Sequence, residues 1–69
     1  MKGVHMNYRQ VRSILVKNGW KCVRKEGSHE QYKKAGHPNL VTLVKHAGRD
    51  LSKGVLSDIE KDSGLSLRR

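Results

Sequence analysis

Most of the architecture follows from residues 20–44, "WKCVRKEGSHEQYKKAGHPNLVTLV". Three runs in this stretch have the composition or the alternation of short strands: 20–25, 29–34 and 40–44. Between them lie "EGS" and "AGHPN", which are rich in turn-forming residues. Because short turns join neighbouring strands in antiparallel fashion, we predict a three-stranded antiparallel meander.

A helix is predicted before the meander, at about residues 8–18. Asn7 followed three positions later by Gln10 is a capping pair, and Asn18-Gly19 supplies a left-handed terminator. Apolar residues recur between them at helical spacing: Tyr8, Val11, Ile14 and Leu15. This pattern indicates an amphipathic helix with one buried side.

A second helix is predicted after the meander, between the cap Ser52 and the terminator Gly64. Its apolar stripe is Val55, Leu56 and Ile59, and Leu65 and Leu67 are expected to fold back onto that stripe. Both helices must cover one face of the sheet, because their stripes have no other place to be buried. The fold class is therefore α+β, helix-strand-strand-strand-helix, with the second face of the sheet open to water.

The length of 69 residues allows a single domain, 1–69, in which we expect residues 1–6 to lie outside the fold. A chain of this size buries only about 60% of the surface that its unfolded form exposes, so its core is small and a deep substrate cavity is not expected. Trp20 is expected in the core, because few other large residues can fill the interior, rather than as a stacking surface for a base. Cys22 is expected to be a small core residue.

Fifteen Lys and Arg against six Asp and Glu give a net charge of +9. A polyanion is the natural partner, and nucleic acid is the leading candidate, because neutralising phosphates releases counterions. A cationic surface kept for solubility, or a DNA-binding or ribosome-associated structural protein, would have the same charge. The single cysteine and the lack of a long apolar run or signal-peptide core indicate a cytoplasmic protein with no membrane contact.

His29, in "KEGSHEQY", is the candidate catalytic residue. Histidine can take or donate a proton near neutral pH, which suits acid-base catalysis. If Tyr32 points into the core, strand alternation sends His29, Gln31 and Lys33 to the open face. The alternative is that His29 is an exposed strand residue that merely follows a tight turn.

Basic and polar residues around this position are candidates for RNA binding: Lys25, Ser28, Lys33, Lys45, His46, Arg49 and Lys53, with Arg24 and Lys34 as further members of a basic track. The track would run from the turn toward the start of the second helix, whose amides can bind a phosphate. Ser28 would equally complete the turn, and His46 would equally bind its own backbone. His37 is expected to be a turn residue. His29, His37 and His46 lack the spacing of a zinc site, so no metal or other cofactor is expected.

Taken together, "NGWKCVRKEGSHEQYKK", "VTLVKH" and "DLSKGVLSDIEKDSGL" resemble, in order and spacing, the HicA family of bacterial toxins, whose members are small messenger-RNA interferases. The likeness runs from about Tyr8 to Leu65. Its most specific parts are the Gly-Trp that ends the first helix, the Gly-Ser-His at 27–29, His46 after the third strand, and the Lys-Gly that opens the second helix with Ile59 following. One departure is Val44 in "LVKH", where many members carry proline.

The resemblance implies a fold like the double-stranded-RNA-binding domain and a metal-independent endoribonuclease that cleaves messenger RNA. It also implies a catalytic histidine at the Gly-Ser-His position, which is His29 here, and a HicB-type antitoxin protein as partner. The alternative function is a non-catalytic module that binds double-stranded RNA by its shape. Such a module would not require His29.

Overall fold

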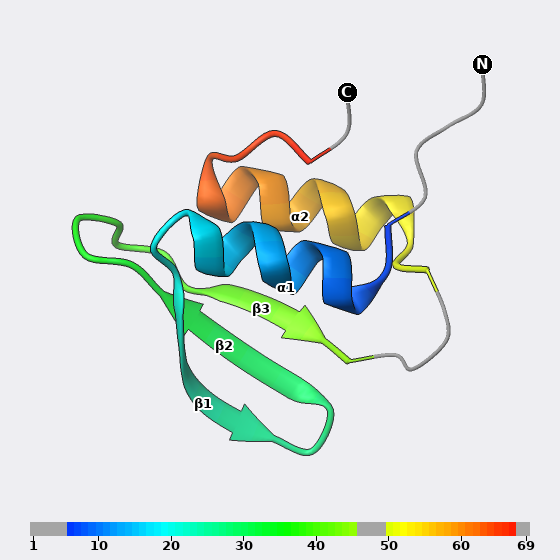
Figure 1. Ribbon diagram of the computed structural model, residues 1–69, viewed down its shortest axis with the longest axis horizontal. Helices are drawn as coiled ribbons and strands as arrows, with labels where there is room; N and C mark the ends of the chain where they lie inside the picture. Colours follow the sequence, from blue (N-terminus) through cyan, green and yellow to red (C-terminus); the bar gives the residue numbers. More distant parts are fainter. Residues whose placement is uncertain (1–5, 46–49, 68–69) are drawn as a thin grey trace.

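The computed structural model describes residues 6–45 and 50–67 and has the predicted α+β architecture. Its elements, in chain order, are α1 (Tyr8–Lys17), β1 (Lys21–Glu26), β2 (His29–Lys33), β3 (Val41–Val44) and α2 (Lys53–Ser63). Both helices lie over the same side of the sheet (Figure 1). The predicted order of elements and the placement of both helices on one face are therefore confirmed.

The sheet is an antiparallel meander with strand order β1-β2-β3. A two-residue turn, Gly27-Ser28, joins β1 to β2, and Gly27 adopts a φ of 59°, which favours glycine. Val23 is an extra residue in β1, because Cys22 pairs with Tyr32 whereas Arg24 already pairs with Gln31. This β-bulge explains why the alternation of β1 is irregular in the sequence.

The helices begin and end where their capping residues predicted. The Asn7 side chain accepts a hydrogen bond from the Gln10 amide at 2.9 Å, and the Gln10 side chain accepts one from the Asn7 amide. At the start of α2 the Ser52 hydroxyl accepts a hydrogen bond from the Val55 amide. Gly64 ends this helix with a φ of 75°, the left-handed conformation that glycine adopts without strain.

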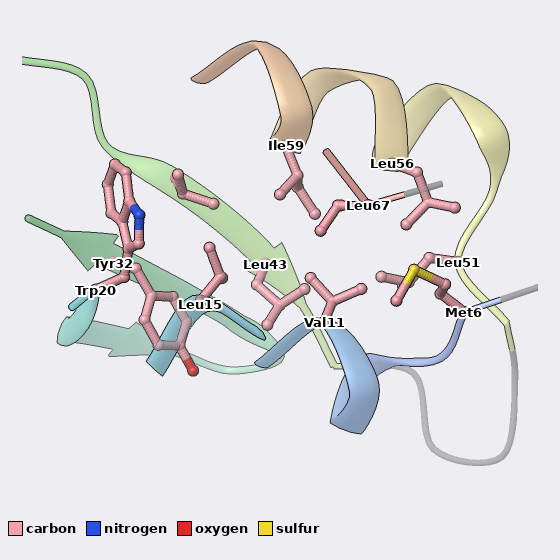
Figure 2. Packing of buried hydrophobic residues seen from close by; sticks show 11 residues of the cluster. Met6, Val11, Leu15, Trp20, Tyr32, Leu43, Leu51, Leu56, Ile59 and Leu67 are labelled. Atoms are coloured by element: carbon pink, nitrogen blue, oxygen red, sulfur yellow. The ribbon is translucent and has the colours of Figure 1, made fainter. Parts of the chain in front are cut away.

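The core is one layer between the helices and the sheet (Figure 2). It comprises Met6, Val11, Leu15, Trp20, Tyr32, Val41, Leu43, Leu51, Leu56, Ile59 and Leu67. Leu67 folds back onto this layer as predicted, and its amide donates a hydrogen bond to a Glu60 carboxylate oxygen at 2.8 Å. Leu65 is partly buried and packs against the layer.

The prediction that residues 1–6 lie outside the fold is wrong for Met6. Its side chain is buried in the core, and its carbonyl accepts a hydrogen bond from the Leu51 amide at 2.8 Å. An isolated bridge between Asn7 and Asp50 continues this pairing. The segment before α1 is thereby held to the segment before α2, which buries Met6 and Leu51 together. Residues 1–5 lie outside the described part of the chain.

The expectation that Cys22 is a core residue is also wrong. All six residues of β1 are exposed, including Cys22. The helices pack mainly on β3, whereas β1 is the edge strand farthest from them (Figure 1). The layer of two helices does not extend over β1. The Cys22 side chain, although it points to the helix side, therefore remains in contact with water.

Leu15 and Val16 are neighbours in α1, and together they test how the core layer packs. Leu15 is fully buried, whereas Val16 is 50% exposed. Replacing Leu15 by Ala should reduce the free energy of unfolding by about 2–5 kcal/mol, because it leaves a cavity in the core. Replacing Val16 by Ala should change it by less than about 0.5 kcal/mol. Urea denaturation measures both, and equal losses in the two variants would contradict the packing described.

Candidate active site

Side chains along β2 alternate between the core and the open face of the sheet. Glu30 and Tyr32 are buried, His29 and Lys33 are exposed, and Gln31 is half-buried. The condition set by the sequence, that Tyr32 points into the core, is thus met. His29, Gln31 and Lys33 consequently lie on the face of the sheet opposite the helices.

His29 is the first residue of β2, directly after the turn, and it is exposed. In the sheet it pairs with Glu26 of β1 and with Val44 of β3. The carbonyl of Ser28 accepts a hydrogen bond from the Lys45 amide at 2.8 Å, so the turn is joined to the end of β3. The imidazole therefore stands on a well-paired part of the backbone and is exposed, so that a substrate can come within hydrogen-bond reach of it, as acid-base catalysis requires.

Two further charged residues share the open face with His29. Directly paired residues of antiparallel strands project to the same side. Glu26, opposite His29, and Arg24, opposite Gln31, consequently lie on that side. The Arg24 guanidinium donates a hydrogen bond to the Glu26 carboxylate at 2.8 Å. From the sequence, Arg24 was predicted only as a further member of the basic track, and no role was predicted for Glu26.

The expected basic track does not form a single row beside His29, because strand alternation divides its lysines between the two sides of the sheet. Lys33 shares the open face with His29, whereas Lys25 pairs with Glu30 and its ammonium lies 3.8 Å from the Glu30 carboxylate. The Lys45 ammonium lies 5.8 Å from the centre of the Tyr8 ring, on the helix side. The cations thus surround the hairpin on both sides.

Three more predicted binding residues follow β3 in the chain. Lys53 is exposed in the first turn of α2. His46 and Arg49 lie outside the described residues. Lys53 belongs to α2 and thus to the helix layer, whereas strand alternation places the His29 side chain on the opposite face of the sheet.

Glu30, a buried carboxylate, follows His29 in β2 and projects to the opposite side of the sheet. Its oxygens accept hydrogen bonds from the Tyr8 hydroxyl at 2.7 and 2.8 Å, and from the Tyr32 hydroxyl at 2.8 Å. Burial alone would raise the pKa of Glu30, but the two tyrosine hydroxyls, with Lys25 and Arg12, hold that pKa below its ordinary value. Burial and the neighbouring carboxylate raise the pKa of Tyr8 and of Tyr32.

Sequence reasoning missed this cluster, although its signal was present. Glu30 precedes Tyr32 by two positions, so the alternation that buries Tyr32 also buries Glu30. The cluster ties α1 to β2 through Tyr8. It thereby fixes the orientation of the strand that carries His29.

Trp20 and His37 pack together at the other end of the sheet. Trp20 is 1% exposed, which confirms its expected place in the core and leaves no ring face for stacking with a base. The His37 ring centre lies 5.1 Å from that of Trp20. The His37 amide donates a hydrogen bond to the Lys34 carbonyl, which confirms its predicted role as a turn residue.

Residues 6–45 and 50–67 contain no group of three or more His, Cys, Asp or Glu side chains arranged to hold a metal ion. Within the same ranges, no helix is long and apolar enough to cross a membrane.

The decisive comparison is with protein families. The family model described as the HicA toxin of bacterial toxin-antitoxin systems matches residues 8–65. The chain belongs to the HicA toxin family. The match runs from the first residue of α1 to just beyond α2 and includes the Gly-Ser-His at 27–29. Membership identifies the protein as the toxin of a toxin-antitoxin pair, which implies an antitoxin partner. No curated protein matches the chain.

The lowered pKa of Glu30 leads to a prediction about acid stability. Because this pKa is lower in the folded state than in the unfolded state, the ionised carboxylate stabilises the fold at pH values above its unfolded pKa, which is near 4.5. This stabilisation is lost as the pH falls through the folded pKa. The wild-type melting temperature should therefore fall more steeply between about pH 5 and pH 3 than that of Glu30→Gln.

Tyr8→Phe provides the matched control, since it removes one hydroxyl and keeps the ring. It should lower the free energy of unfolding at pH 7 by about 1.5–3 kcal/mol, the contribution of a hydrogen bond to a charged group. The fall of its melting temperature between about pH 5 and pH 3 should be intermediate between those of wild type and Glu30→Gln. If the melting temperatures of all three proteins fell equally with pH, the cluster would not stabilise the ionised carboxylate.

Proposed function

We propose that this HicA family toxin is a metal-independent endoribonuclease that cleaves messenger RNA, with His29 as its acid-base catalyst. The observation that carries the proposal is the exposed His29 at the start of β2, on the face of the sheet that the helices leave uncovered. It occupies the Gly-Ser-His position of a chain that belongs to the HicA family.

The chemistry requires only proton transfer at a held phosphodiester. The ribose 2′-oxygen attacks the adjacent phosphorus, the bond from phosphorus to the 5′-oxygen breaks, and the products are a 2′,3′-cyclic phosphate and a 5′-hydroxyl. An imidazole can take the proton of the 2′-hydroxyl in its neutral form or protonate the 5′-oxygen in its charged form. An exposed sheet face suits this reaction because an RNA strand can lie along it without entering a cavity.

The charge of the protein supports a nucleic acid substrate and an acidic inhibitor. The net charge of +9 favours contact with a phosphate backbone. We propose that a HicB-type antitoxin covers the open face with an acidic surface and so excludes RNA from His29. Complementary charge would speed the encounter between the two proteins.

The test is incubation of purified wild type and His29→Ala with messenger RNA in the presence of EDTA. Wild type should release fragments that end in a 2′,3′-cyclic phosphate. His29→Ala should remain folded, as judged by its melting temperature, and should cleave about 10²- to 10⁴-fold more slowly, the usual contribution of a positioned acid-base group.

His37→Ala is the matched control, because it removes a histidine that packs on Trp20, away from the open face. This variant should still cleave RNA. Undiminished cleavage by His29→Ala would refute the assignment of the catalyst. RNA binding without any cleavage by wild type would favour the non-catalytic double-stranded RNA module, and binding to DNA alone would exclude both.

A further inference from the structure

Arg24 and Glu26 stand next to His29 on the open face, although they precede it in the chain. Glu26 is the direct partner of His29 across β1 and β2, and Arg24 is the partner of Gln31. Directly opposed side chains have Cβ atoms about 4.5–5.5 Å apart, and diagonal neighbours such as Arg24 and His29 about 7–8 Å apart. A phosphate placed at the imidazole is therefore within reach of the long Arg24 side chain.

The Arg24 guanidinium already holds an anion in the free protein. It donates a hydrogen bond to the Glu26 carboxylate at 2.8 Å, and the two side chains are 64% and 69% exposed. An ion pair so open to water is weak. An RNA phosphate, which presents two oxygens to the fork of the guanidinium, can displace such a carboxylate.

We propose that Arg24 binds the RNA phosphate next to His29 and that Glu26 competes with the RNA for Arg24. The inference rests on the proposed function, and it names a substrate-binding residue together with the residue that restrains it. Glu26 acts as an internal substitute for the phosphate. Binding of RNA exchanges one carboxylate partner of the guanidinium for one phosphate partner.

A second explanation of any effect of Glu26 must be separated from this one. A carboxylate beside an RNA strand repels it whether or not Arg24 is present. Competition for Arg24, by contrast, exists only while Arg24 is there. Removing Glu26 in the presence and in the absence of Arg24 distinguishes the two mechanisms, because coupled residues show non-additive effects.

The experiment measures RNA binding apart from cleavage. Four full-length proteins carry His29→Ala, so that the RNA stays intact: this variant alone, and with Arg24→Gln, Glu26→Gln or both. The probe is a fluorescein-labelled single-stranded RNA of mixed sequence, followed by fluorescence anisotropy at several salt concentrations. Asp58→Asn and Arg9→Gln, which remove exposed charges from the helices, are the matched controls.

Glu26→Gln should tighten binding by about 1.5- to 5-fold, the range that corresponds to an exposed ion pair. Arg24→Gln should weaken binding more than Arg9→Gln does. It should also reduce the slope of log affinity against log salt by about 0.7, the value for one phosphate contact on a single strand. In the Arg24→Gln background, Glu26→Gln should give no further gain beyond that of Asp58→Asn.

An equal gain from Glu26→Gln in both backgrounds would overturn the proposal in favour of simple repulsion. An Arg24→Gln variant that binds as Arg9→Gln does would also overturn it, as would a protein that binds no RNA. Failure of the proposed function has a different signature. If wild type cleaves nothing while the binding data show the coupling described, Arg24 is a phosphate-binding residue of a protein that does not cut RNA.

Discussion

The alternation of side chains along β2 determines both which residues of this strand enter the core and which lie on the open face. Tyr32 and Glu30 point toward the helices, so His29 and Gln31 point away from them. Tyr8 and Tyr32 both donate hydrogen bonds to Glu30, which joins α1 to the strand from the buried side. A slip of one residue in this strand would bury His29 and expose a carboxylate that now has two partners. The core thereby determines which side chains the open face offers.

Several elements could be predicted because their signals are local. The capping pair Asn7 and Gln10 and the terminator Gly64 lie within a few residues of the helix ends that they determine. The meander follows from short strand-like runs separated by turns. The outward direction of His29 follows from the place of Tyr32, since the period of a strand is two residues. These parts of the candidate site required no knowledge of distant contacts.

The remaining features depend on contacts between distant parts of the chain. Cys22 is exposed because the helices do not extend over β1, and no pattern within β1 reveals how wide the helix layer is. Met6 is buried because its backbone pairs with Leu51, which lies far along the sequence. The neighbours of His29 depend on strand register. Strand alternation places Lys25 on the helix side with Glu30 and Arg24 and Lys33 on the open face, so a basic track read along the sequence becomes two groups of cations on opposite sides of the sheet.

The candidate site around His29 is an exposed face of the sheet, and this bears on the proposed restraint of the toxin by its antitoxin. Under the proposed function, an RNA strand of varied sequence would lie along this face and be held through its phosphates, and an antitoxin that covered the face would exclude it. NMR titration with RNA whose 2′-hydroxyls are methylated, and which therefore stays intact, tests whether this face is where RNA binds. The imidazole signals of His29 should shift on binding, whereas those of His37, which packs on Trp20, should stay unchanged. Shifts confined to His37, with His29 unaffected, would contradict the account.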